Sequence, residues 1–292
     1  MWNLRGGEFG RLETVVVKSP REAFGTGEAI AREWRELAFT DAPDLERAIA
    51  EYERFAAILA SAGADVLTLP AAAGTGLDSL YARDASVLAP HGVVLCEMGK
   101  PQRRGEPAAQ RHAFESWGIP IAGAIAPPGR LEGGDVIWLD ARTVVVGRGY
   151  RTNDEGIRQY RAILGAGIDE MMVVPLPHWR GPGDVFHLMS IISPIDRGLA
   201  VVYSPLMPVP FREALMARGV SLVEVPDEEF ASMGANVLAI APRSCVMVDG
   251  NPLTRARLEA AGARVHVYEG AEISLKGGGG PTCLTRPLVR AV

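Results

Sequence analysis

The chain has 292 residues, of which 48% are hydrophobic and 22% charged, as in an average globular protein. Its net charge of −5 argues against a nucleic-acid partner, because such proteins need a basic surface to displace counterions from phosphates. No apolar run approaches the roughly 20 residues that cross a bilayer, and the polar segment 1–11 lacks the apolar centre of a secretory signal. We therefore expect neither nucleic-acid nor membrane partners.

The three cysteines, Cys96, Cys245 and Cys283, are odd in number and widely spaced along the chain. They provide neither a disulfide framework nor a paired zinc site. This usage is typical of a reducing compartment, so we expect a cytoplasmic protein.

A loose internal repeat runs along the chain, consisting of two β-rich runs, a helical run and a short apolar strand. The first copy has a strand at 13–18, a helix at 43–63 that begins with Pro43, and a strand at 64–70. The later copies comprise 86–90, 92–98, 108–117 and 119–125; 135–140, 142–149, 153–164 and 170–176; 187–195, 199–205, 211–218 and 221–226; and 235–242, 244–250, 252–261 and 263–269. In the third copy, Asn153 is predicted to cap the start of the helix.

Each of the five units is too small to bury its own apolar faces, so the units must pack against one another. We predict an α+β fold with pseudo-five-fold symmetry, a closed five-bladed propeller of ββαβ units that forms one catalytic domain over residues 1–292. The alternative is an open α/β sheet with helices on both faces. The hairpins, and the lack of a GxGxxG turn after the first strand, favour the propeller.

Cys283 follows a run of four glycines in the segment 276–282. Such a run is costly in entropy and is tolerated where the backbone passes close to a ligand or takes positive φ. This context makes Cys283 a candidate nucleophile rather than a small buried hydrophobe, the role that we assign to Cys96 and Cys245.

A cysteine nucleophile needs a proton carrier, and His187 begins a β unit at one of the junctions where functional loops are expected. Asp78, Asp84 and Glu132 lie at equivalent junctions. Three converging carboxylates would repel one another unless a cation lies between them. A planar guanidinium suits them, because its N–H groups pair bidentately with carboxylates. A metal ion is the rival, but no ligand pair has metal-binding spacing, so we expect none.

Three motifs, Glu132-Gly-Gly-Asp135, His187-Leu188 and the glycine run before Cys283, occur in this order. With them, residues 11–288 resemble the guanidine-modifying enzymes, namely arginine deiminases, amidinotransferases and dimethylarginine dimethylaminohydrolases. Within this superfamily the chain is most similar to the dimethylarginine dimethylaminohydrolases. The resemblance implies the five-bladed pentein propeller, in agreement with the repeats.

The resemblance also implies a role for each candidate residue. The segments 77–84, 103–106 and 151–156 match family motifs that bind the substrate. By this match Asp78 and Asp84 bind the guanidinium, and Arg103 and Arg151 bind the substrate carboxylate, with Arg104 left open as an alternative to Arg103. Cys283, His187 and Glu132 match the catalytic cysteine, histidine and glutamate.

The hypothesis is therefore a hydrolase that cleaves a guanidino C–N bond of arginine or Nω-methylated arginine through a covalent thiouronium on Cys283. Dimethylarginine would give citrulline and dimethylamine. Where deiminases and amidinotransferases carry an aspartate two residues after the histidine, this chain has Met189, which disfavours plain arginine and leaves room for N-alkyl groups.

Two alternatives use the same Cys-His-Glu site, namely arginine deimination and amidino transfer to an amine. A ring-shaped binding protein is the non-enzymatic alternative, and it gives no reason to keep the cysteine, histidine and glutamate together. We expect a small-molecule guanidino substrate and no cofactor, and we leave open whether the chain forms a homodimer.

Overall fold

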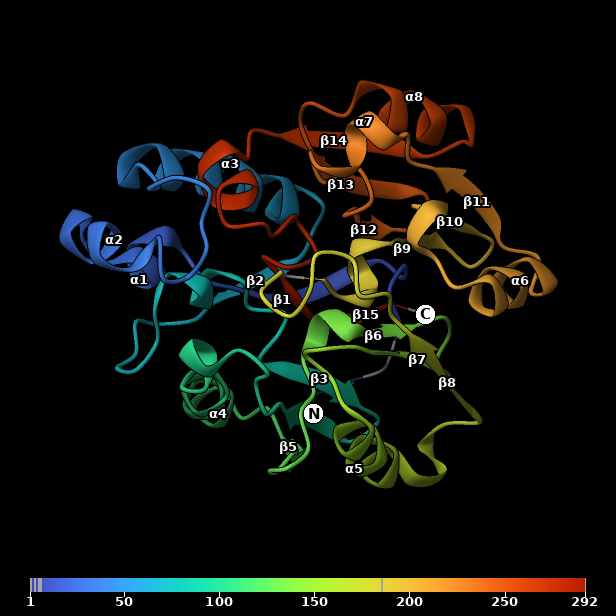
Figure 1. Ribbon diagram of the computed structural model, residues 1–292, viewed down its shortest axis with the longest axis horizontal. Helices are drawn as coiled ribbons and strands as arrows, with labels where there is room; N and C mark the ends of the chain where they lie inside the picture. The colour runs from blue at the N-terminus through green and yellow to red at the C-terminus, as the bar shows by residue number, and fades with distance from the viewer. Residues whose placement is uncertain (1, 3, 5–6, 185, 292) are drawn as a thin grey trace.

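The computed structural model describes residues 2, 4, 7–184 and 186–291, and within this part the strands form five three-stranded sheets arranged around a common centre (Figure 1). We call these sheets blades 1 to 5. They comprise β15 (Arg286–Arg290), β1 (Leu12–Val17) and β2 (Asp65–Thr68); β3 (Ser86–Ala89), β4 (Gly92–Leu95) and β5 (Ile121–Ala124); β6 (Val136–Trp138), β7 (Thr143–Arg148) and β8 (Glu170–Pro175); β9 (Ile192–Asp196), β10 (Leu199–Val202) and β11 (Ser221–Glu224); and β12 (Leu238–Ala241), β13 (Ser244–Val248) and β14 (Arg264–Tyr268).

All five blades have the same topology. The middle strand pairs antiparallel with the first strand and parallel with the third. A helix connects the middle strand to the third and lies at the periphery of the ring (Figure 1). These connecting helices are α3 (Leu45–Ser61), α4 (Glu106–Ser116), α5 (Asp154–Leu164), α6 (Val209–Ala217) and α8 (Pro252–Ala260), and shorter helices are α1 (Pro20–Phe24), α2 (Gly27–Glu33) and α7 (Asp227–Phe230). The predicted ββαβ repeat is confirmed.

The apolar core shows that the ring is closed. Five buried clusters lie between successive pairs of blades, and the last of them joins blade 5 back to blade 1. Alternate residues of one strand enter different clusters. In β7, Val144 and Val146 face blade 2, whereas Val145 faces blade 4. Because both faces of each sheet are largely buried, the central strands are mainly apolar rather than strictly alternating.

Blade 1 is assembled from both ends of the chain. Its first strand is β15, which pairs antiparallel with β1, for example Val15 with Pro287. The repeat pattern predicted only two strands for this unit, because residues 286–290 follow Cys283 and stand apart from the other four copies. The pairing of β15 with β1 closes the ring through backbone hydrogen bonds.

Helix boundaries differ from the prediction at one point and agree at another. The first long helix begins at Leu45, not at Pro43, because the Asp44 carboxylate caps it by accepting the Arg47 N–H at 2.9 Å. Asn153 caps α5 as predicted, accepting the Gly156 N–H at 2.9 Å.

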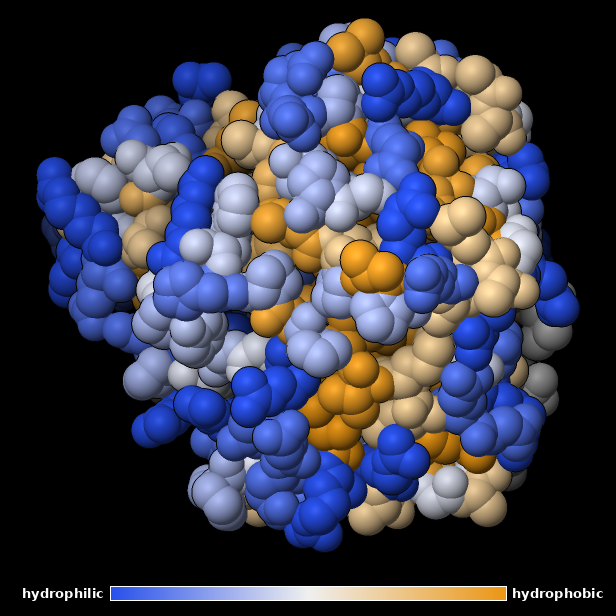
Figure 2. Space-filling view, turned by 45° about the vertical axis from the view of Figure 1, so that its right-hand side comes forward, coloured by the Kyte–Doolittle hydropathy of each residue, from blue (hydrophilic) through white to orange (hydrophobic). Residues whose placement is uncertain are grey.

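None of the described helices is long and apolar enough to cross a membrane. Figure 2 shows hydrophilic residues over the left-hand side of the molecule and apolar residues reaching the surface near the middle of that face.

Candidate active site

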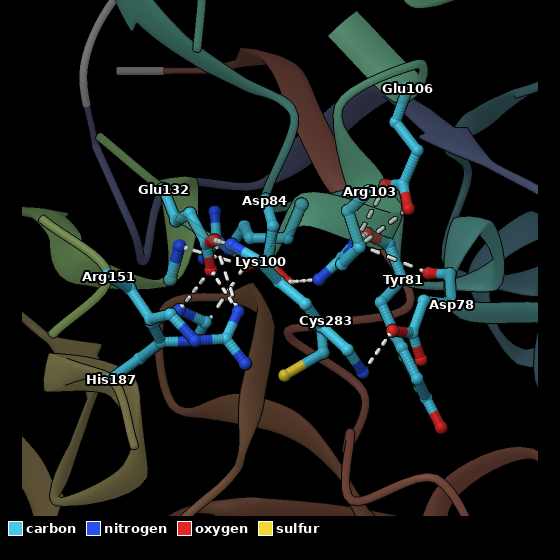
Figure 3. Close-up of polar contacts among 12 residues, drawn as sticks. Asp78, Tyr81, Asp84, Lys100, Arg103, Glu106, Glu132, Arg151, His187 and Cys283 are labelled. Carbon is cyan, nitrogen blue, oxygen red and sulfur yellow. Dashed lines mark hydrogen bonds and ion pairs between the residues drawn. The ribbon is translucent and has the colours of Figure 1, made fainter. Parts of the chain in front are cut away.

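A cavity of about 290 Å³ opens at the centre of the ring. Its lining comes from segments that lie between the strands of the five blades, including one loop that carries Trp179 and Arg180 and another that follows α2. The side chains that carry charge or sulfur in its wall include Asp78, Asp84, Lys100, Arg103, Arg151, His187 and Cys283 (Figure 3). The structure therefore brings six of the seven predicted site residues to one cavity, and Glu132 lies directly behind it.

The pseudo-symmetry explains this convergence. In each blade, the segment that leads into the first strand contributes one polar side chain at the centre. These residues, in the order of blades 2, 3, 4, 5 and 1, are Asp84, Glu132, His187, Asn236 and Cys283. Loops at one end of a propeller axis meet, so residues more than 100 apart in the sequence become neighbours.

Cys283 is half-buried at the edge of the glycine run, with its thiol facing the cavity. Burial raises the pKa of this thiol, and the nearby Asp84 carboxylate raises it further. The Asn236 amide opposes that shift by donating from Nδ2 to Sγ at 3.4 Å. Without a bound cation, the protein therefore holds Cys283 largely as the neutral thiol. A cationic ligand beside Sγ would favour the thiolate.

The His187 side chain is buried beside two carboxylates. Its Nε2 lies 2.8 Å from Glu132 Oε2, and its Nδ1 lies 3.9 Å from Asp84 Oδ1. Burial on its own lowers the pKa of His187, but the charges of Asp84 and Asp135 and the hydrogen bond with Glu132 outweigh it and raise this pKa to about 9. The imidazole is thus protonated at neutral pH and can act first as an acid.

Glu132 is fully buried and holds two cations in place. Burial alone would raise its pKa, but the His187 hydrogen bond and the Arg151 charge hold that pKa well below its usual range. Arg151 Nη1 donates to both carboxylate oxygens, at 2.9 and 3.1 Å. The N–H groups of Gly99 and Lys100 donate to Oε1 as well. Glu132 therefore orients His187 and Arg151 instead of facing the cavity itself.

Each nitrogen of the Arg103 guanidinium group donates a hydrogen bond to another group of the protein. Its side chain is 3% exposed, and Nη1 donates to Asp84 at 2.5 Å while Nε and Nη2 form a fork with Glu106. Nη2 also reaches the carbonyl oxygens of Asp78 and Tyr81. These contacts fix the loop that carries Asp78 and Asp84. They also occupy the guanidinium that was expected to bind the substrate carboxylate, so that role stays a prediction. Arg104 points outward, with a side chain 63% exposed.

Asp78 faces the cavity together with Lys100, whose Nζ donates to Oδ2 at 2.6 Å. The same ammonium donates to the Leu37 carbonyl at 2.8 Å and so holds the segment after α2 against the cavity. Neither Lys100 nor Asn236 was singled out from the sequence. Asn236 precedes the first strand of the fifth unit. The expectation that functional residues lie at the junctions between units, which pointed to His187, would also have pointed to Asn236. For Lys100 the sequence carried no comparable signal.

The glycine run has a packing explanation. A Cβ on Gly277 or Gly279 would overlap atoms of the Tyr81 side chain, and Gly278 has φ +76°. The backbone before Cys283 is therefore pressed against Tyr81, which lines the cavity. Only glycine permits this approach.

Three buried side chains could offer ligand atoms to a metal ion. Oxygen and nitrogen atoms of Asp84, Glu132 and His187 lie within 4.8 Å of one another. Arg103 and Arg151 already donate to the two carboxylates, and their positive charge opposes a further cation. This donor set therefore suits an acid–base arrangement better than a metal centre.

The fold and this site define a class, the guanidine-modifying enzymes of the pentein propeller. Residues 32–290 match the family model described as "N,N dimethylarginine dimethylhydrolase, eukaryotic", and the chain belongs to this family. The superfamily and the propeller inferred from the sequence are both confirmed. The chain is accordingly a guanidino-group hydrolase.

The chain is also similar to individual proteins. The chain is 28% identical to the uncharacterized protein YkgA of Bacillus subtilis, over 97% of this chain and 94% of that protein. It is 31% identical to an N(G),N(G)-dimethylarginine dimethylaminohydrolase of Streptomyces coelicolor, over 63% and 65% of the two chains. It also matches arginine deiminases of Listeria species, of whose length it spans 62%.

A crystal structure of dimethylarginine dimethylaminohydrolase from Pseudomonas aeruginosa has the same fold. It superposes with a TM-score of 0.76 at 22% identity, over 94% of this chain and 98% of that one. That protein is a cysteine-to-serine variant in complex with citrulline.

Proposed function

We propose that this protein hydrolyses a C–N bond of a substrate guanidinium on Cys283, with His187 as the proton carrier. The observation that carries the proposal is that Cys283 and His187 line one cavity, where Glu132 anchors His187 at 2.8 Å. Asp84 supplies the negative charge beside the thiol. The family makes Nω-methylated arginine the reference substrate.

The first half-reaction begins when the guanidinium binds beside Asp84. Its positive charge lowers the pKa of the Cys283 thiol, which loses its proton to solvent. The thiolate attacks the guanidinium carbon and an S–C bond forms. The C–N bond to the departing amine then breaks, while the His187 imidazolium donates its proton to that nitrogen. A thiouronium remains on Cys283.

The second half-reaction returns the enzyme to its starting state. His187, now neutral, takes a proton from a water molecule as the water attacks the thiouronium carbon. The carbonyl of the product forms as the C–S bond breaks, the proton of the added hydroxyl group passes to the Cys283 sulfur and restores the thiol, and the ureido product leaves. From dimethylarginine the products are citrulline and dimethylamine. Glu132 holds the imidazole in position throughout.

Met189 supports a preference for N-alkylated guanidinium groups. Its side chain is 2% exposed and lines the cavity near His187, so this part of the wall is apolar. An alkylated nitrogen has fewer N–H groups to satisfy and tolerates such a wall better than an unsubstituted one. Arginine deimination stays the second candidate, because of the likeness to the arginine deiminases.

The test is turnover of arginine, monomethylarginine and dimethylarginine side by side, with identification of the amine released. Methylamine or dimethylamine with citrulline supports the proposal, ammonia from arginine supports deimination, and ornithine supports amidino transfer. Cys283→Ser should lose turnover while it still binds substrate. Substantial activity in that variant would show that another group is the nucleophile.

We also propose that residues 1–292 form one catalytic domain and that the protein works in the cytoplasm. The closed circle of five core clusters supports the first point. The three free thiols support the second.

A further inference from the structure

The ammonium group of Lys100 lies inside the candidate active site, beside the carboxylate of Asp78. Lys100 and Asp78 both line the cavity that Cys283 faces (Figure 3). Their side chains are 16% and 7% exposed, and Nζ lies 2.6 Å from Asp78 Oδ2. The Leu37 carbonyl oxygen accepts from the same Nζ at 2.8 Å. The ion pair is thus a shielded part of the cavity wall and not a solvated surface pair.

One carboxylate and one carbonyl around an N–H₃ group make an ammonium-binding position. From the resemblance to the family, Asp78 was expected to bind the substrate guanidinium. In the structure the protein's own lysine pairs with one oxygen, Oδ2, of that carboxylate. A substrate ammonium that used Oδ2 and the Leu37 carbonyl would have to displace Lys100, and one that used Oδ1 would meet the repulsion of the Lys100 charge.

The other carboxylates around the thiol also have cationic partners. Asp84 pairs with Arg103, and Glu132 pairs with Arg151 and His187. Among the described lining residues, the remaining carboxylate is Asp184, on the outer loop that also carries Arg180. Among the described residues, the inner part of the cavity therefore offers a substrate guanidinium the Asp84 charge and offers a substrate ammonium no carboxylate that lacks a cation of the protein beside it.

Free donors in the same cavity suit a carboxylate instead. Lys100 uses two of its three N–H groups on Asp78 and Leu37, which leaves one N–H for a ligand. Arg151 donates from Nη1 to Glu132, and its Nη2 meets no acceptor among the described residues. An anionic group at the far end of the substrate could bind both cations.

We propose that Lys100 occupies the ammonium position of this cavity, so that the enzyme prefers ω-guanidino carboxylates without an α-amino group over the corresponding amino acids. This inference rests on the proposed function and narrows its substrate class. The preferred substrate is a guanidinium, N-alkylated or not, joined by a short apolar chain to a carboxylate. For the arginine skeleton this is 5-guanidinopentanoate or its Nω,Nω-dimethyl derivative.

The experiment compares kcat/KM for dimethylarginine and for 5-(dimethylguanidino)pentanoate, which differ only in the α-amino group. The wild-type protein should favour the compound without the amino group by about tenfold or more, the effect of breaking or straining one charge-assisted hydrogen bond. Higher kcat/KM for dimethylarginine would overturn the inference.

A variant pair locates the cause. Lys100→Met keeps the length of the side chain and removes its charge, so the preference should fall by about tenfold as Asp78 becomes free for a substrate ammonium. Lys276→Met is the matched control, because Lys276 also lines the cavity and its Nζ also donates to one carboxylate and one carbonyl, those of Glu272 and Ala42. The control should keep the wild-type ratio. An unchanged ratio in Lys100→Met would show that Lys100 does not set the preference.

Two failures can be told apart. If both compounds are hydrolysed and the amino acid is favoured, the substrate inference is wrong and the proposed function stands. If neither compound is hydrolysed and mass spectrometry finds no thiouronium on Cys283, the proposed function is wrong, and the inference that rests on it is wrong as well. The wild-type ratio tests the inference even if Lys100→Met does not fold.

Discussion

The His187 imidazole and the Glu132 carboxylate form a buried pair, with 2.8 Å between Nε2 and Oε2. The side chains are 5% and 0% exposed, so little solvent screens their interaction. Arg151 Nη1 donates to both oxygens of the same carboxylate. One buried negative charge therefore orients both the proton carrier and a cation of the cavity.

This pair makes the stability of the protein depend on pH. The pKa of His187 rises from an ordinary 6.5 to about 9 in the folded protein. A group whose folded pKa is raised stabilises the fold fully below its unfolded pKa, and this contribution is lost as pH rises through the folded value. The free energy of unfolding should therefore fall between pH 6.5 and 9, by an amount on the order of 3 kcal/mol from this residue.

Urea unfolding between pH 6 and 10 measures the effect. His187→Gln should flatten the fall over this interval, whereas His91→Gln, in an exposed turn, should keep the wild-type slope. Equal slopes in the wild type and His187→Gln would mean that the imidazole is not held protonated by its carboxylates.

Glu132→Gln should impair catalysis more than substrate binding. The amide keeps the shape but removes the charge that orients His187 and helps to raise its pKa. We expect kcat to fall by about 10²–10³-fold with a smaller change in KM, and the alkaline limb of the pH profile to move to lower pH. Steady-state kinetics from pH 6 to 10 checks both. Glu259→Gln, in an exposed pair with Arg255, is the control, and a profile that keeps its alkaline limb would contradict the assigned role.

Most of the fold and a large part of the site could be predicted from the sequence. Hairpins followed by helices at a regular spacing were sufficient to predict the ring, because each unit needs a neighbour on both sides. The pairing of β15 with β1 could not be predicted, since it joins residues at opposite ends of the chain. The contacts of Arg103 and Lys100 could not be predicted for a different reason, although their partners Asp78 and Asp84 are close in the sequence. Residue types predict charge, but only the packed loops show which charges satisfy one another.

Gly134, in the motif Glu132-Gly-Gly-Asp135, lies so close to His187 that a side chain there would collide with it. A Cβ at this position would lie 2.5 Å from His187 Nδ1 and 2.9 Å from Asp84 Oδ1. Gly134→Ala should therefore displace the imidazole and lower kcat by about tenfold or more, with the fold largely kept. Gly198→Ala is the matched control, because its new Cβ would meet its nearest neighbour, the Gly219 carbonyl oxygen, at an ordinary 3.7 Å. Kinetics and thermal melting of the two variants decide the matter, and equal kcat values would show that His187 has room to adjust.

The Cys283 thiol should react differently with neutral and cationic reagents. Because burial raises its pKa, alkylation by iodoacetamide should be slow at pH 7 and accelerate above the ordinary range of a thiol. Chloroacetamidine carries a positive charge that can pair with Asp84, so it should label Cys283 at neutral pH. Asn236→Ala removes the hydrogen bond to Sγ, and it should shift the iodoacetamide profile to still higher pH. Peptide mapping assigns the site, with the buried Cys96 and Cys245 as internal controls. If both reagents showed the same pH profile at Cys283, the proposal that a bound cation activates this thiol would fail, since a thiol that ionises on its own has no need of the substrate charge.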